Sequence, residues 1–358
     1  MHLIEILNLR HTVAAGVSIG ITRRCPLHCA HCSTRSSMDS EQAPEWIFER
    51  FVSTFRPDSR PEILALSGGE ALLRPELVRM LAERARRVGT RTSVLSGLFF
   101  AGAARIPPSI LKAIDAVDHF SVSLDVFHER EVPRTRVFDI LEQVLARGKD
   151  VSLHLVGTDA DDPYLERLIG DVRARFGTAV PMLVNALSYF GRARAWLPND
   201  RAARGGKASA QDANPCAMAA WPVVGFDGCI AACGNDDALD ERPGHLILGH
   251  AATDDWQTIR ERTLQSNVLR AIRLYGPEVT ARRVGNTPSS CDGYCGTCMA
   301  LSKNHAAGPP LEALMQRPTT RVLEAEVQAL LADGGADAFV RRHGIARYAV
   351  LVHLGEPA

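Results

Sequence analysis

The chain has 358 residues, which is enough for one large domain with an appendage or for two domains. Hydrophobic residues make up 46% of the sequence and charged residues 23%, a composition that excludes a disordered or fibrous protein. The 41 basic and 41 acidic residues balance to a formal net charge of zero. The balanced charge therefore gives no electrostatic support for binding to nucleic acid or to a membrane, and neither is expected as a partner.

The amino-terminal residues 1–16 lack the charged start and apolar run of a signal peptide, and no stretch of about 20 apolar residues follows. These features predict a cytoplasmic protein. In that reducing compartment, nine cysteines are expected to be metal ligands or redox groups rather than disulfides. Three of them stand close together, and six lie far downstream at positions 216, 229, 233, 291, 295 and 298.

From residue 16 to about 190, short β-branched or apolar runs alternate with segments of helical periodicity, the pattern of consecutive βα units. The expected strands are Gly16–Thr22, Glu62–Leu66, Thr92–Leu95, His119–Leu124, Val151–Val156 and Val180–Ala186. The expected helices are Ala43–Phe55, Pro75–Val88, Arg136–Arg147 and Tyr164–Phe176. The pattern predicts an α/β fold, a partial (βα)6 TIM-like barrel with its function at the carboxyl ends of the strands.

The chain is expected to divide into four segments. They are a barrel (residues 1–197), a linker (198–215), an auxiliary cluster domain (216–305) and a C-terminal extension (306–358). The second segment is polar and rich in Gly, Ala and Ser, which predicts a linker. The third holds six cysteines among turn-rich sequence, and we expect a small domain that needs metal to hold its shape. The last has helical periodicity and a final apolar run, Tyr348–Leu354, which predict a helical and strand extension.

Cys25, Cys29 and Cys32 stand directly after the first predicted strand. A loop of this length can bring three thiolates onto three irons of one [4Fe-4S] cluster and leave the fourth iron free to bind a cofactor. The alternative is a zinc knuckle with His28 or His31 as the fourth ligand.

This Cys-x3-Cys-x2-Cys spacing resembles the signature of the radical S-adenosylmethionine (SAM) superfamily. Ser67-Gly68-Gly69-Glu70, after the second predicted strand, resembles the glycine-glycine-glutamate motif of that family. The resemblance implies a [4Fe-4S] cluster that binds SAM, with the backbone of the glycines and the Glu70 carboxylate at the amino group of SAM. It also implies cleavage of SAM to a 5′-deoxyadenosyl radical, which takes hydrogen from an unactivated C–H bond.

Three further positions resemble SAM contacts of the family. His31 stands where an aromatic residue often meets the adenine. Ser123 and Asp125 end the fourth predicted strand, where polar side chains often face the ribose and carboxylate of SAM, although polar residues also end strands for other reasons. Tyr189–Ala193 is similar to a segment common in members with an added C-terminal cluster domain.

The downstream cysteines resemble the SPASM or twitch extension of the family, in which a turn glycine and an apolar residue, as in Phe226–Cys233, precede a ligating cysteine. The resemblance implies a second, auxiliary [4Fe-4S] cluster. Its implied ligands are Cys216, Cys233, Cys295 and Cys298. Six cysteines are too few for a full SPASM domain, so the single-cluster twitch form is the closer match.

Cys229 and Cys291 then lack an assigned role. Each could be a substitute ligand, a buried structural thiol, or a hydrogen-atom donor to a substrate radical, and a three-cysteine cluster from Cys216, Cys229 and Cys233 also stays open. In the loop after the fourth strand, His128 and Glu129 could bind or deprotonate a polar substrate, with a helix start carrying solvated charges as the alternative. Cys229, His128 and Glu129 are thus the candidate catalytic residues.

Enzymes that resemble this chain either oxidise or epimerise sugars and aminocyclitols or crosslink ribosomally made peptides. Only about 15 residues precede the first predicted strand, too few for a leader-recognition domain, which favours a small polar metabolite over a peptide substrate. A flavodoxin or ferredoxin is the expected electron donor. A non-catalytic zinc or electron-carrier protein is a weaker alternative, because Ser67–Glu70 would then have no purpose.

Overall fold

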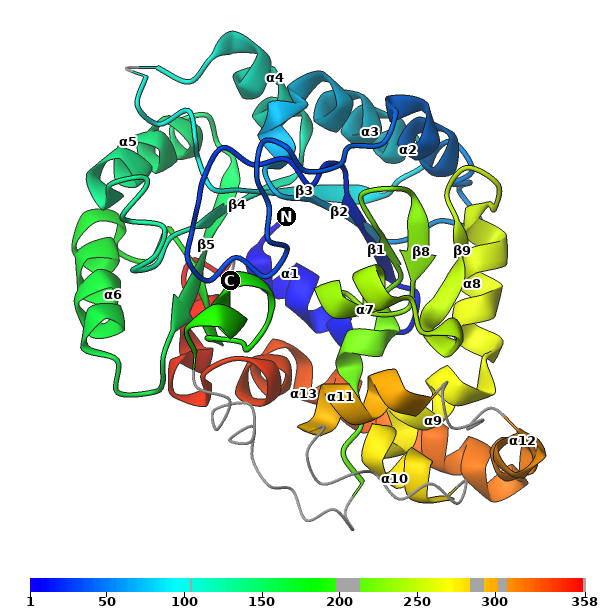
Figure 1. The fold of residues 1–358 in the computed structure, drawn as a ribbon. Coiled ribbons are helices and arrows are strands. Elements are labelled where there is room, and N and C mark those ends of the chain that lie inside the picture. The colour runs from blue at the N-terminus through cyan, green and yellow to red at the C-terminus, as the bar shows by residue number, and fades with distance from the viewer. Residues whose placement is uncertain (104, 198–212, 284–292, 302–307, 357–358) are drawn as a thin grey trace.

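The computed structural model describes residues 1–103, 105–197, 213–283, 293–301 and 308–356. Six parallel strands follow one another around a ring (Figure 1). They are β1 (Gly16–Gly20), β2 (Ile63–Ser67), β3 (Arg91–Ser96), β4 (His119–Ser123), β5 (Asp150–Gly157) and β6 (Met182–Ala186). All six predicted strands are confirmed to within a few residues, and so is the partial TIM-like α/β fold.

Helices cover the outer face of this ring (Figure 1). They are α2 (Glu45–Val52), α3 (Pro75–Arg87), α4 (Pro108–Ala116), α5 (Arg134–Leu145) and α6 (Pro163–Phe176). In α3 the buried residues recur at helical spacing, as in Leu77, Val78 and Leu81, so one face packs on the sheet. Helix α4 was not predicted, because it is short and begins at the second of two adjacent prolines, which resemble a turn.

The sheet continues beyond β1 into the segment that was expected to form a separate domain. β7 (Val223–Val224) pairs in parallel with β1, and β8 (Cys229–Ala231) and β9 (Ile247–His250) add antiparallel strands. The described residues thus form one nine-stranded sheet. Residues after 216 therefore share the scaffold of the barrel.

Short helices complete this part of the chain. They are α7 (Asp236–Glu241), α8 (Trp256–Gln265), α9 (Asn267–Tyr275), α10 (Pro277–Arg283) and α11 (Gly293–Ala300). Trp256, Leu269 and Ile272 are almost fully buried and belong to the main hydrophobic core. Apolar packing therefore supports this region in addition to any metal.

The carboxyl-terminal extension consists of α12 (Pro309–Gln316), α13 (Pro318–His343) and a 3-10 helix, η8 (Ala346–His353). Helix α13 bends at Gly335, where φ is 51°, and packs against α1 (Leu3–Asn8) and β6 on the side that the six strands leave open (Figure 1). The prediction of a strand in the final apolar run was wrong. Most of the run belongs to η8, which lies beside β6, and Ile345, three residues before the run, donates to the Val184 carbonyl at 2.9 Å.

None of the helices in the described part of the chain is both long and apolar enough to cross a membrane.

His119 connects the amino terminus to the barrel through hydrogen bonds. Its burial indicates that the fold loses stability in acid. Its ring nitrogens lie 2.8 Å from the Met1 carbonyl and 2.8 Å from Ser152 Oγ. Burial lowers the pKa of His119 to about 3, whereas the unfolded chain protonates it near a pKa of about 6.5. The unfolded state therefore binds more protons between these values, and stability is lost as the pH falls below about 6.5.

Between pH 7.5 and pH 5.5, the free energy of unfolding should fall by about 1 kcal/mol less in His119→Gln than in the wild type. Denaturant unfolding at both pH values measures this difference. His353→Gln is the control of opposite sign, because hydrogen bonds to Glu356 and Asp337 raise the pKa of that exposed histidine. An unchanged pH dependence in His119→Gln would refute the assignment.

Candidate functional site

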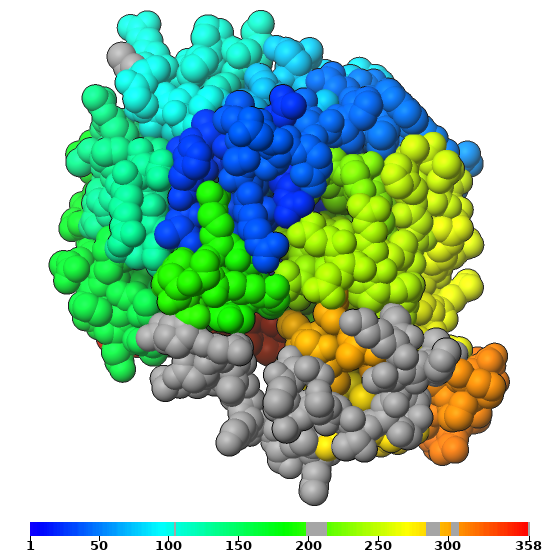
Figure 2. All heavy atoms as spheres, in the orientation of Figure 1, coloured from blue at the N-terminus to red at the C-terminus, as the bar shows by residue number. Residues whose placement is uncertain are grey.

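The three amino-terminal cysteines lie in one loop after β1. This loop covers the mouth of the ring, and the segment after β6 lies against it (Figure 2). Cys25 and Cys29 are buried and Cys32 is half-buried, and all three are free thiols. Burial, with a further contribution from Glu70 and the other two cysteines, raises the pKa of Cys25 to about 12. The structure therefore gathers two buried thiols and one half-buried thiol that a metal could hold as thiolates.

Gly68 and Gly69 bring the end of β2 directly against this loop. Gly69 N–H donates to the Thr22 carbonyl at 2.7 Å, and Glu70 N–H donates to the Arg24 carbonyl at 2.9 Å. A Cβ atom at Gly69 would overlap the carbonyl oxygens of Arg23 and Arg24. The predicted close approach of the glycines is thus an approach to the cysteine loop itself.

The Glu70 carboxylate is fully buried at the same junction. It accepts hydrogen bonds from Leu72 N–H at 2.9 Å, Gly97 N–H at 2.9 Å and Ser96 Oγ at 3.0 Å. Burial outweighs these hydrogen bonds and raises the pKa of Glu70. The side chain therefore links the ends of β2 and β3 below the cysteine loop.

Asp125 joins two histidines next to the cysteines. Its Oδ2 lies 3.2 Å from His31 Nε2 and 3.3 Å from His128 Nδ1. Burial alone would raise the pKa of Asp125, but the hydrogen bonds from His128 and His31 hold it well below its usual range. Phe127 stacks on the His31 ring with centroids 4.6 Å apart. The predicted SAM contacts His31 and Asp125 therefore meet in one buried group.

His128 connects this group to the cluster loop. Burial would lower the pKa of His128, but its hydrogen bonds with Asp125 and with Cys29 raise it to about 10. The ring is thus a cation at neutral pH that contacts one of the three predicted cluster ligands. This contact could not be read from the sequence, because Cys29 and His128 are far apart along the chain.

The donor sets differ in their spacing. His31, Asp125 and His128 place their ligand atoms within 4.8 Å of one another, and no three cysteine sulfurs in the described ranges do so. Thiolates on a single tetrahedral zinc ion lie about 3.8 Å apart. The cysteine sulfurs are thus spaced more widely than one zinc ion requires.

Ser123 ends β4 beside His154 on β5. His154 Nε2 is buried without a hydrogen-bond partner, and burial lowers the pKa of this histidine to about 4. By contrast, His119 and His353 have hydrogen-bond partners. The sequence predicts a satisfied core or surface role for both. The sequence predicts that His154 is a satisfied core or surface residue rather than a ligand, and its unpartnered Nε2 differs from that expectation.

Glu129 lies outside the histidine group. Its carboxylate accepts hydrogen bonds from Arg134 at 2.6 Å and from the Tyr164 hydroxyl at 2.7 Å. The Arg134 hydrogen bond is the main reason that the pKa of Glu129 is lowered. The carboxylate is thus paired with Arg134 at the start of α5 rather than solvated alone.

Arg192 contacts the cluster loop and was not singled out by residue type. Its N–H donates to the Cys32 carbonyl at 2.9 Å, and its guanidinium donates to the Ser36 carbonyl at 2.8 Å. Burial alone would raise the pKa of Cys32, but hydrogen bonds from Thr34 and Arg192 lower it. Gly191, with φ of 57°, allows the approach, since a Cβ there would overlap the Cys32 carbonyl.

The predicted auxiliary ligands converge from three segments. Cys216 precedes the 3-10 helix η5 (Ala217–Ala220), Cys233 follows β8, and Cys295 and Cys298 lie one turn apart on α11. Burial, together with the nearby sulfurs of the other three, raises the pKa of Cys298 well above its usual value. The four thiols, of which Cys295 is exposed, therefore lie close enough to act on one another electrostatically.

Cys229 is separate from this group. It is buried in β8, and the charges that act on its thiol are those of Asp227 and Arg242 rather than the other cysteines. Cys291 lies outside the described residues. Most of the predicted linker, residues 198–215, also lies outside them.

Residues 19–172 match the family model of the Radical SAM superfamily. This part of the chain, less than half of its length, is similar to a radical SAM domain. The match contains Cys25, Cys29, Cys32 and Glu70 and ends before the downstream cysteines. No curated protein matches this sequence.

Solved structures resemble the fold of this chain. The structure of polyhistidine-tagged anSMEcpe with bound AdoMet is 14% identical with a TM-score of 0.50, over 83% of this chain and 98% of that chain. Streptococcus suis SuiB is 12% identical with a TM-score of 0.45, over 65% of this chain and 63% of that chain. BtrN in complex with AdoMet and 2-DOIA is 10% identical with a TM-score of 0.43, over 73% and 88%. This chain thus spans less than two thirds of the SuiB chain.

Proposed function

We propose that this chain is an enzyme that reductively cleaves SAM and removes a hydrogen atom from an unactivated C–H bond of a small polar metabolite. The observation that carries the proposal is the meeting of Cys25, Cys29 and Cys32 with Gly68-Gly69-Glu70 inside a radical SAM domain. The three free thiols would hold a [4Fe-4S] cluster, which, when SAM is bound, supplies the electron that yields a 5′-deoxyadenosyl radical.

The residues around the cysteines have complementary roles in this proposal. The carboxylate of Glu70 and the backbone of Gly68 and Gly69 receive the ammonium of SAM, and Ser123, Asp125 and His31 contact its ribose, carboxylate and adenine. His128 holds Asp125 and donates to Cys29, which fixes the orientation of both. The ring of strands and the loop that covers it exclude water from a radical that would otherwise react elsewhere.

The auxiliary site belongs to the same proposal. Cys216, Cys233, Cys295 and Cys298 would hold a second [4Fe-4S] cluster, which is supported by their mutual proximity in the structure. A flavodoxin or ferredoxin is the proposed source of electrons for the enzyme. Oxidation or epimerisation of a sugar or aminocyclitol is the proposed net reaction, supported by the polar side chains of Ser123 and His154 at adjacent positions of β4 and β5.

The anaerobically reconstituted protein should bind about eight irons per chain and release 5′-deoxyadenosine from SAM when dithionite is added. Glu70→Gln should reduce this release at least tenfold, because a carboxylate that pairs with the ammonium of SAM loses its charge. The control is Glu62→Gln, an exposed carboxylate that pairs with Arg60. Zinc binding without iron, or release of no 5′-deoxyadenosine by the wild type, would refute the proposed function.

A further inference from the structure

Arg10 lies beside the downstream cysteines. Its guanidinium carbon is 4.5 Å from the centre of the Trp221 ring and 5.6 Å from that of Phe339, and its Nη2 is 3.8 Å from Met218 Sδ. Met218 and Trp221 belong to or directly follow η5, the helix that begins after Cys216. The guanidinium is therefore held between two aromatic rings next to the auxiliary site.

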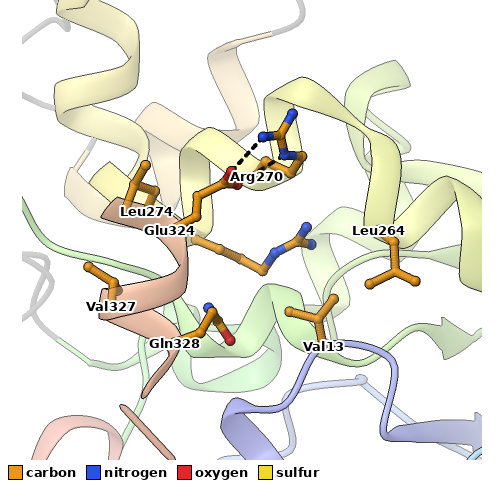
Figure 3. A pocket seen from close by; sticks show the side chains of 8 residues that line it. Val13, Leu264, Arg270, Leu274, Glu324, Val327 and Gln328 are labelled. Carbon is orange, nitrogen blue, oxygen red and sulfur yellow. Dashed lines mark hydrogen bonds and ion pairs between the residues drawn. The ribbon is translucent and has the colours of Figure 1, made fainter. Parts of the chain in front are cut away.

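Arg273 reaches the same helix from α9. It is only 6% exposed, and its guanidinium donates to the Ala219 carbonyl at 3.3 Å and to the Thr263 carbonyl at 3.0 Å. Arg270, one turn earlier on α9, instead forms an ion pair with Glu324 (Figure 3). Within the described ranges, no carboxylate forms an ion pair with Arg10 or Arg273.

Both arginines stay charged at neutral pH. Burial lowers the pKa of each to about 10. For Arg273 the charge of Glu324 opposes this effect most, and the nearby sulfur of Cys216 opposes it for both arginines. The sulfur of Cys233 acts on Arg10 as well. Arg10 is half-buried, and the charges that oppose the effect of burial on it are those of the Cys233 and Cys216 sulfurs. Desolvating a cation without an ion pair is unfavourable, so an anionic group at these cysteines would offset part of that cost.

We propose that Arg10 and Arg273 are the counter-ions of the auxiliary cluster and raise its reduction potential. The proposal rests on the auxiliary cluster of the proposed function. Four thiolates give a [4Fe-4S] cluster a net negative charge, and reduction by one electron makes that charge larger. A buried cation nearby therefore stabilises the reduced cluster more than the oxidised cluster, and aromatic surroundings screen this interaction less than water would. The assignment favours an electron-accepting role for the cluster over a role limited to holding the substrate.

The test is a redox titration of the full-length reconstituted protein followed by electron paramagnetic resonance. The auxiliary signal is the one that persists when Cys25, Cys29 and Cys32 are replaced by alanine. Arg10→Met keeps the apolar contacts with the rings but removes the charge, and Arg10→Lys keeps the charge. Arg262→Met is the control, since this arginine is half exposed and pairs with Asp254.

At a fixed potential, Arg10→Met should lower the ratio of reduced to oxidised auxiliary cluster by about tenfold, which corresponds to about 59 mV for one electron. Arg273→Met should shift it in the same direction, and Arg10→Lys and Arg262→Met should stay close to the wild type. If Arg10→Met fails to bind the auxiliary cluster while Arg10→Lys binds it, the result still supports a requirement for positive charge at residue 10. The reduction potential is then measured in Arg273→Met.

The two proposals fail in different ways. If the variant without Cys25, Cys29 and Cys32 binds no iron, the auxiliary cluster itself is refuted. If that variant binds about four irons but the potentials of Arg10→Met and Arg273→Met equal that of the wild type, the cluster stands and its assignment of counter-ions is overturned.

Discussion

Replacing Cys25, Cys29 and Cys32 together by alanine should abolish the release of 5′-deoxyadenosine from SAM. The three thiols are the only cysteines in residues 19–172, which match the radical SAM family model, so their loss removes every thiolate there that could hold the proposed SAM-binding cluster. The loop itself should keep its position, because backbone hydrogen bonds such as Gly69 N–H to the Thr22 carbonyl and Arg192 N–H to the Cys32 carbonyl hold it.

The measurements are 5′-deoxyadenosine after addition of dithionite and SAM, iron per chain, and circular dichroism. The triple variant should lose about four of about eight irons and keep its secondary structure. Cys229→Ala is the matched control, since it removes a buried thiol outside this loop. Continued cleavage of SAM by the triple variant would refute the central claim.

Removing one auxiliary ligand should have the second largest effect. Cys233→Ala or Cys298→Ala should each lose about four irons, because the four downstream thiols lie near one another and a cluster needs them together. The loss should also increase hydrogen exchange in α11, because a metal that joins η5, β8 and α11 contributes to the folding of the segment between them. Helices α8 and α9 should change less, since their side chains belong to the main core.

Cys229→Ala separates the loss of a ligand from the loss of a hydrogen donor. Its thiol is buried in β8 away from the four, so the iron content should stay that of the wild type. If Cys229 donates hydrogen, the variant should still release 5′-deoxyadenosine, but product should fall and deuterium from solvent should no longer enter it. Loss of iron in Cys229→Ala would instead place it among the ligands.

Much of the barrel could be predicted because its signals are local. The β-branched run before Cys25 and the helical spacing of Leu77, Val78 and Leu81 each depend on a few neighbouring residues. The shorter helix α4 and the run Tyr348–Leu354 were harder, because prolines and apolar residues occur in several kinds of structure.

The candidate site could be predicted only in part, because some of its features are local in the sequence and others depend on contacts made after folding. The spacing of Cys25, Cys29 and Cys32 indicates a common loop, and so it indicates a metal site before any packing is known. That His128 contacts Cys29, and that Glu129 pairs with Arg134, depends on how the loop after β4 turns over the mouth of the ring.

By itself the sequence determined the strands of the radical SAM domain, its three neighbouring thiols and the Gly68-Gly69-Glu70 turn, since these features lie within short segments. Only the tertiary structure decided that β7 extends the sheet beside β1, that His154 Nε2 stays unpartnered, and that Arg10 lies against Trp221. Each of these results joins segments far apart in the chain or depends on the register of neighbouring strands. Contacts of this kind are selected by the packing of the whole core, which no local pattern encodes.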